Sequence, residues 1–254
     1  MLGTFLCLAL LNTYTHERSV NMKTLTLLAL GSLLFLAGCG SSSDSVESDT
    51  AGDVNFRVTF TTTWNGTDFP TNYPSSAHWS PLVGTVHNEQ VVFWAPNDQP
   101  ATAGIKSMAE TGSTSAFDTE IQSAKASGYS QGRIQASGIS TGSGSTSIEF
   151  STSDTYPLLT LTSMVAPSPD WFVGVHGLAL QDEEGEWIET QTINLEIYDA
   201  GTDDGVQFTS ANSDTSSQNL SISLLSSDRA DTDIENGQHF SSGKYVGTLL
   251  IEKI

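Results

Sequence analysis

Cysteine is almost absent from this sequence of 254 residues. The two that occur, Cys7 and Cys39, both precede the region in which strand-like patterns begin. A small extracellular fold that relies on several disulfide bonds is therefore excluded. The fold must be stable through its apolar core alone, and roughly 200 residues of one all-β domain can bury such a core.

Basic residues are also scarce. The chain has 9 Lys and Arg against 29 Asp and Glu, which gives a formal net charge of −20. Because nucleic-acid binding depends on neutralising phosphates with Lys and Arg, this balance argues against a nucleic-acid partner. An acidic surface attracts cations and keeps a protein soluble, so most of these carboxylates are expected to be solvated.

No apolar run is long enough to cross a bilayer as a helix, which requires about twenty residues. The run at residues 25–37 is shorter than that, and Met22 and Lys23 stand directly before it. A short charged region followed by a short apolar region is typical of a cleavable export signal, which we place at residues 22–38. Residues 1–21 carry charges that would spoil such a signal, so we interpret them as a mis-called upstream extension.

The apolar run ends in Leu36-Ala37-Gly38-Cys39. These residues resemble the bacterial lipobox, in which the cysteine receives a diacylglycerol and the chain is cut before it. An ordinary secretory signal followed by a chance cysteine is the alternative. The resemblance implies a membrane anchor through lipid on Cys39, which is stable when two or more acyl chains are attached. It also implies a cell-envelope location, with sorting to the outer membrane in a host that has two membranes, because Gly40 rather than Asp follows the cysteine.

The segment at residues 39–53 comprises the lipidated cysteine and a linker rich in Ser, Gly and Asp. It lacks apolar periodicity, which indicates a flexible spacer with a reach of roughly 20 Å. The remaining residues, 54–254, are predicted to form one domain.

Residues 54–60 alternate apolar and polar side chains, which is the pattern of a half-buried strand. Between residues 103 and 126 apolar residues recur at helical spacing, and Gly112 with Ser113 divides two short helices. About eight strands with little helix predict an all-β fold, an antiparallel β-sandwich. The further predicted strands lie at residues 90–94, 147–151, 158–165, 171–180, 193–198, 220–225 and 245–251.

The motifs of several enzyme classes are missing from the sequence. It contains no HExxH, no Ser-His-Asp context and no Gly-rich phosphate loop, so hydrolase and nucleotide-binding functions lack support. His78 and His87 are not spaced as metal ligands, and we interpret both as structural. The same applies to four tryptophans that we expect in the core rather than on a sugar-stacking surface, namely Trp79, Trp94, Trp171 and Trp187.

Three segments of the predicted domain have distinctive sequences. They are AHWSPLVGTVHN at residues 77–88, PSPDWFVGV at residues 167–175 and YDAGTDDG at residues 198–205. In this order they resemble the spondin N-terminal domain family, the F-spondin/mindin-like domains, over essentially the whole of residues 56–251. The resemblance implies a C2-like spondin β-sandwich, an extracellular role in adhesion or receptor binding, a bound divalent cation that we expect to be Ca²⁺, and no enzymatic activity.

The resemblance also implies metal ligands. Two aspartates of the family match Asp170 and Asp199, and Asp203 could add a third carboxylate. The family's glutamate falls on Ser151 when counted without gaps, and Glu149 lies two residues earlier on the same face of a strand. Carboxylates on loops suit calcium, which takes six to eight oxygen ligands. The alternative for Asp170 and Asp199 is that they cap turns through Asx hydrogen bonds.

The sequence therefore predicts a surface-tethered recognition domain whose partner is an extracellular protein or glycan. Two other functions stay open. A sandwich-fold carbohydrate-active enzyme would need two carboxylates about 5–5.5 Å or 6.5–9.5 Å apart across an open cleft. A purely structural envelope protein would need neither a soluble partner nor a metal.

Overall fold

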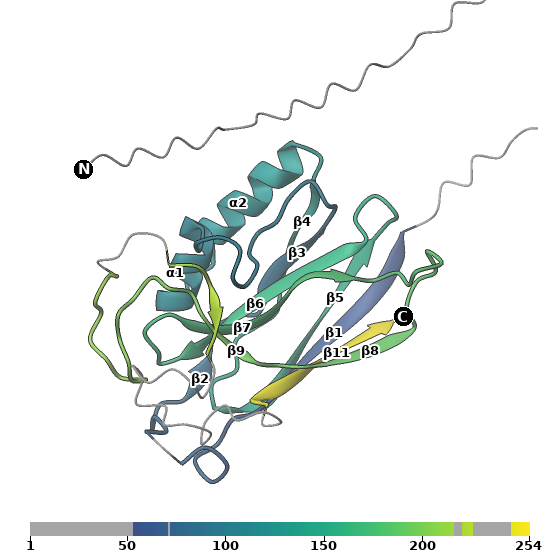
Figure 1. Cartoon of the computed structure of the whole chain (residues 1–254). Helices are drawn as coiled ribbons and strands as arrows, with labels where there is room; N and C mark the ends of the chain where they lie inside the picture. The colour runs from purple at the N-terminus through teal and green to yellow at the C-terminus, as the bar shows by residue number, and fades with distance from the viewer. Residues whose placement is uncertain (1–52, 71, 216–219, 226–244) are drawn as a thin grey trace, which may run out of the picture. The chain divides into compact units, whose positions relative to one another are not determined.

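The computed structural model of the protein describes residues 53–70, 72–215, 220–225 and 245–254 (Figure 1). The predicted upstream extension, the signal peptide, Cys39 and nearly all of the linker lie outside the described residues. None of the helices in the described ranges is both long and apolar enough to cross a membrane.

The smaller of two sheets has four antiparallel strands and contains both ends of the domain. β1 lies beside the last strand of the chain, and its side chains alternate between the core and solvent as the sequence pattern predicts. Phe56, Val58 and Phe60 are fully buried, whereas Arg57 on the opposite face is half-exposed. The strand order is β5 (Ser143–Thr152), β1 (Val54–Thr63), β11 (Gly247–Lys253) and β8 (Thr190–Asn194).

The larger sheet is also antiparallel, and β6 (Leu158–Ala166) lies inside it. β6 is buried at nearly every position because both of its faces are covered, which explains its almost continuous apolar run. β2 (His78–Trp79) pairs with β6 beside the main order. That order is β10 (Ser223–Leu224), β9 (Ile197–Asp199), β7 (Trp171–Ala179), β6, β3 (Val83–His87) and β4 (Ser130–Gln135).

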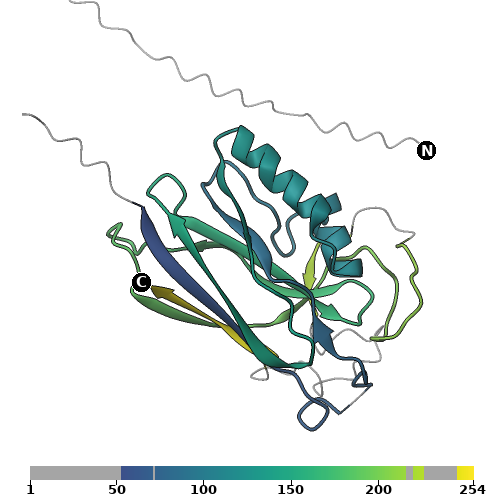
Figure 2. The same ribbon diagram turned by 180° about the vertical axis from the view of Figure 1, so that it is seen from behind.

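Two helices cover the face of the larger sheet that points away from the smaller one (Figures 1 and 2). They are α1 (Ala103–Thr111) and α2 (Ser115–Ala126), and they confirm the two helices predicted from spacing. Gly112 ends α1 in the left-handed region with φ 68°, and its N–H donates to the carbonyl of Met108. Glycine adopts this conformation without the steric penalty of a Cβ, so Gly112 separates the helices as expected.

The layers enclose two apolar cores. The first lies between the sheets and includes Trp79 and Trp171, while Trp187 packs against its edge. The second lies between the larger sheet and the helices and includes Trp94. The predicted antiparallel sandwich is therefore confirmed, and the four tryptophans contribute to packing.

The predicted strands at residues 90–94 and 193–198 need correction. Residues 90–94 form no strand; Phe93 and Trp94 enter the second core from a loop, where their rings contact Phe117 and Phe172 at 5.6 and 5.0 Å between centroids. Residues 193–198 split between β8 and β9, which belong to different sheets. At residues 90–94 the apolar residues reflect burial of a loop, whereas at residues 193–198 the alternation is real but the chain passes from one sheet to the other.

Candidate metal centre

Asp170 lies in the turn between β6 and β7 and is fully buried, with 0% of its surface exposed. Ser168 holds the turn, because its Oγ accepts a hydrogen bond of 3.1 Å from the backbone N–H of Trp171. Trp171 then begins β7 with its side chain in the core. The rigid turn and the buried ring beside it fix the Asp170 carboxylate inside the protein.

The two carboxylate oxygens of Asp170 have different surroundings. Oδ2 accepts three hydrogen bonds, from the N–H and Oγ1 of Thr202 at 2.7 and 3.2 Å and from the N–H of Asp203 at 3.1 Å. Oδ1 is also buried, yet no donor among the described residues reaches it. A buried acceptor without a partner is uncommon in folded proteins, and a proton, a water or a cation would satisfy it.

Asp199 is the second buried carboxylate at this place. It ends β9, where it pairs with Trp171 of β7, so the strand register places it beside the Asp170 turn. Its side chain is 4% exposed, and Oδ1 accepts a 2.8 Å hydrogen bond from the N–H of Gly201. Gly201 has φ +70°, which lets the loop curl back over the carboxylate.

The closeness of these two carboxylates changes the protonation of Asp170. The pKa of Asp170 is raised to about 7, first by burial and second by the negative charge of Asp199, while the hydrogen bonds from Thr202 and Asp203 oppose the rise. Two buried negative charges side by side are unfavourable unless a proton or a cation neutralises one of them. The site is therefore suited to a positive ion.

Asp203 has another role in the same loop. It is 6% exposed, its Oδ1 accepts from the N–H of Gly205 at 2.7 Å, and its Oδ2 accepts from the N–H of Ser213 at 2.8 Å. Both oxygens thus cap the loop, and this fixes the backbone N–H that Asp203 donates to Asp170. The Asx bond predicted as the alternative role is present at Asp199, which accepts from Gly201, and at Asp203, whereas Asp170 accepts only from the distant loop at Thr202 and Asp203.

Glu149 is not brought to these aspartates. It lies on β5 in the smaller sheet, its side chain is 60% exposed, and it forms an ion pair of 2.6 Å with Arg57. Ser151, two residues along, bonds to the side chain of Asn55 at 2.7 Å. Of the four predicted metal ligands, the structure gathers Asp170, Asp199 and Asp203 and places Glu149 elsewhere.

The aspartates adjoin a hollow of about 390 Å³ that is lined by Asp199, Asp203, Asp204 and the loop before β10. Within the described ranges, no three His, Cys, Asp or Glu side chains are arranged as a ready metal site. A cation here would thus depend on Asp170 and Asp199 together with backbone carbonyls and water, a donor set that calcium accepts. Sequence reasoning missed Thr202, although it stands inside the YDAGTDDG string.

Comparison with known proteins identifies the family of this domain. The family model described as Spondin_N matches residues 54–235, a range that includes all three strings. The chain belongs to the spondin N-terminal domain family. Human Spondin-2 is 36% identical over 178 residues, which are 68% of this chain and 53% of that protein. Rat Spondin-1 is 32% identical over 217 residues, which are 80% of this chain and 26% of that protein.

The spondin match covers the domain rather than these whole relatives. The chain spans about half of the length of Spondin-2 and about a quarter of Spondin-1. The family and the sandwich predicted from sequence are thus confirmed. Activities and partners of the longer proteins do not follow from the match alone.

Proposed function

We propose that this protein is a cell-envelope lipoprotein that displays a spondin-type domain, stabilised by a divalent cation, for adhesion or recognition outside the cytoplasm. The family supports the recognition domain. The lipobox-like residues 36–39 support the lipid anchor, and the short linker that follows leaves the domain close to the membrane surface. The acidic charge of the chain favours a cation over an anion as the bound ion.

One observation carries the cation proposal. The Asp170 Oδ1 is buried and receives no hydrogen bond from the part of the chain that the structure describes, and the carboxylate lies beside the buried Asp199. Calcium bound by Asp170 and Asp199 would satisfy that oxygen and cancel the repulsion between the two charges. It would also tie the β6–β7 turn to the loop after β9, which fixes the shape of this end of the sandwich.

The enzyme alternative receives less support. A glycosidase needs two carboxylates that face a substrate across an open cleft. Asp170 is fully buried and is held by Thr202 and Asp203, so a sugar cannot reach it without opening the loop. A non-enzymatic binding domain accounts for this burial, because a cation that is bound between two loops does not require an open cleft through which a substrate can enter.

Calcium titration of the full-length protein by calorimetry tests the cation proposal. We expect binding heat and a melting temperature that is several degrees higher in calcium than in EDTA, since ligand at a hundred times Kd stabilises by about 2.7 kcal/mol. Asp170→Asn and Asp199→Asn should each abolish both effects, because each removes one of two ionised ligands.

Asp182→Asn is the matched control. Asp182 also accepts backbone N–H bonds, from Glu184 and Glu186, but it lies in an exposed hairpin and does not line the hollow beside the candidate ligands. The Asp182→Asn protein should bind calcium like the wild type. A wild-type protein without binding heat and without a calcium-dependent melting shift contradicts the cation proposal.

The anchor is tested separately by membrane fractionation. The wild-type protein should sediment with membranes and incorporate labelled fatty acid, whereas Cys39→Ala should do neither. Fatty-acid incorporation that persists in Cys39→Ala would contradict anchoring at this residue.

A further inference from the structure

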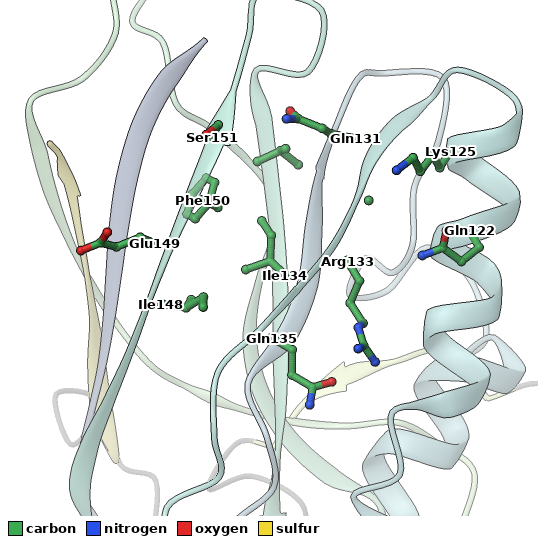
Figure 3. Close-up of a pocket in the computed structure, with 12 residues that line it drawn as sticks. Gln122, Lys125, Gln131, Arg133, Ile134, Gln135, Ile148, Glu149, Phe150 and Ser151 are labelled. Carbon is green, nitrogen blue, oxygen red and sulfur yellow. The ribbon is translucent and has the colours of Figure 1, made fainter.

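A groove of about 510 Å³ lies at the opposite edge of the larger sheet from the aspartates (Figure 3). Its floor and walls come from α2, β4 and β5. β4 is the last strand of the larger sheet and β5 the last strand of the smaller one, so each is paired on one side only. The groove is therefore the place where the sandwich is left open between two strand edges.

The floor of the groove is apolar. Ile134 of β4 is 7% exposed and belongs to the core between the sheets. Ile148 and Phe150 of β5 are only partly buried, although they point toward the same core. Phe150 is held in place by stacking on Phe56, with 6.0 Å between ring centroids. These half-covered side chains offer contacts to the apolar residues of a ligand.

The rim of the groove carries two cations and several amides on its α2 and β4 side, and Glu149, which pairs with Arg57, on its β5 side. Lys125 points from α2 toward β4, and Arg133 lies on β4 itself (Figure 3). Arg133 has a loose ion pair of 3.7 Å with Asp118. Lys125 has no acidic partner among the described residues, whereas Arg57, Arg133, Lys106 and Lys253 each have one.

One amide in the groove also lacks a partner. The Oε1 of Gln131, on β4, is buried and receives no hydrogen bond from the described residues. Water or a bound molecule that donates an N–H or O–H would satisfy a buried acceptor of this kind. The groove thus combines a free strand edge, an apolar floor, an unpaired ammonium and an open acceptor.

We propose that the groove binds an extended acidic peptide segment of a partner protein, which adds as a strand to the free edge of β4. Strand addition supplies main-chain hydrogen bonds, and side chains at alternate positions determine which sequence binds. Apolar residues of the peptide would cover Ile134 and Phe150, while its carboxylates would face Lys125 and Arg133. The inference rests on the proposed recognition function and supplies the chemistry of its partner.

Charge decides between this occupant and a second copy of the chain. Two β4 edges brought together would place Lys125 and Arg133 against their own equivalents, which is repulsive, and charged edge strands discourage such pairing. An acidic strand meets opposite charges instead. The carboxylates at the groove, Glu149 and Asp118, are each paired with an arginine. Charges farther than about 8 Å oppose the peptide only weakly, because they are largely screened at physiological ionic strength.

The test uses the full-length protein and a labelled peptide of alternating glutamate and valine with both ends blocked. Fluorescence anisotropy should show saturable binding, in calcium and in EDTA alike. The Lys125→Gln, Arg133→Gln double variant should bind about tenfold more weakly or worse, since lost charge contacts raise the dissociation rate. Both side chains are exposed, so the variant should keep the wild-type melting temperature.

Three controls isolate the mode of binding. Lys253→Gln removes a basic residue outside the groove, one that pairs with Glu189, and should leave peptide binding unchanged. A glutamine–valine peptide should bind weakly because it lacks charge. An N-methylated glutamate–valine peptide should also bind weakly, because it keeps the carboxylates but cannot donate main-chain hydrogen bonds to a strand edge.

Several outcomes would overturn the proposal. These are no binding of the glutamate–valine peptide, equal binding by the double variant, and equal binding of the N-methylated peptide. Preferential binding of an acidic oligosaccharide such as oligogalacturonate would show that the ligand is a glycan and not a peptide. Calcium binding is measured independently at the other edge of the sheet, so either proposal can fail while the other holds.

Discussion

His87 shows how two partners determine the position of a proton. Its Nδ1 lies 2.9 Å from the carbonyl oxygen of Asn88, which can only accept, so Nδ1 carries the hydrogen. Its Nε2 lies 2.8 Å from Thr160 Oγ1 and therefore accepts the hydroxyl hydrogen. The side chain is 2% exposed, and burial lowers the pKa of His87 below its ordinary value. The folded protein thus keeps His87 neutral under conditions in which the unfolded chain protonates it.

This asymmetry predicts a loss of stability in mild acid. Below the unfolded pKa of about 6.5, the unfolded state binds a proton that folded His87 does not, so the free energy of unfolding falls as the pH falls. Between pH 7.5 and 5.5 we expect His87 to contribute about 1 kcal/mol to this loss. Urea unfolding of the wild type and of His87→Gln at both pH values measures it, since the variant should show a smaller loss. Equal losses in both proteins would mean that His87 does not titrate as described.

The aspartates and Glu149 show what sequence can predict about individual site residues. Asp170 and Asp199 stand in strings whose turn residues and following strands fix their positions, and the structure brings them together. Glu149 was placed by counting along β5, which gives the face of a strand but not the sheet to which the strand belongs. β5 joins the smaller sheet, so its carboxylate pairs with Arg57 instead.

At the scale of elements, α2 caps the beginning of α1. The carboxylate of Glu120 in α2 accepts from the N–H of Gly104 at 2.7 Å and from Thr102 Oγ1 at 2.8 Å. Thr102 is the N-cap of α1 and accepts from the N–H of Ile105 at 3.2 Å. The first turn of α1 has no acidic residue of its own. Glu120 therefore supplies the negative charge that favours a helix N-terminus and links the two helices.

Removal of this link should destabilise the helical layer without changing the sheets. Glu120→Ala leaves the N–H of Gly104 without its acceptor, and we expect the free energy of unfolding to fall by about 1–2 kcal/mol. Glu120→Gln keeps one acceptor and should lose less. Denaturant unfolding followed by circular dichroism gives both values, and Glu184→Ala in the exposed hairpin is a control that should change little. An unchanged Glu120→Ala protein would show that the cap contributes nothing.

The elements found from sequence were those with a regular period or, as in β6, a long apolar run. β1 alternates apolar and polar residues and the two helices carry apolar residues at helical spacing, so the structure contains these elements where the patterns predict them. β3 was missed because all five of its residues are buried, which removes the alternation, and β4 was missed because its sequence SQGRIQ is mostly polar. Both strands owe their conformation to neighbours across the sheet rather than to local preference.

At the scale of the whole molecule, charge separates two faces of the domain. The aspartates lie at the β9 edge of the larger sheet, while the groove with Lys125 and Arg133 lies at its β4 edge. The first place suits a cation and the second an anionic ligand. Since the intervening strands β7, β6 and β3 are packed into both cores, the two edges are held rigidly but share no side chain. The domain can therefore use a cation for its shape and the groove for recognition.

The same excess of acidic residues predicts how salt affects the stability of the domain. After cleavage before Cys39, the chain would carry 28 acidic and 7 basic residues, so repulsion outweighs attraction. The described ion pairs lie mostly at exposed positions and contribute little each. The screening length falls from about 30 Å at 0.01 M salt to about 10 Å at 0.1 M.

In EDTA, the melting temperature of the domain should therefore rise by a few degrees between 0.01 M and 0.1 M salt. Sodium and choline chloride should act equally, because screening depends on ionic strength alone. A melting temperature that falls with salt would show that the ion pairs, rather than the repulsion, dominate the electrostatic energy of the fold.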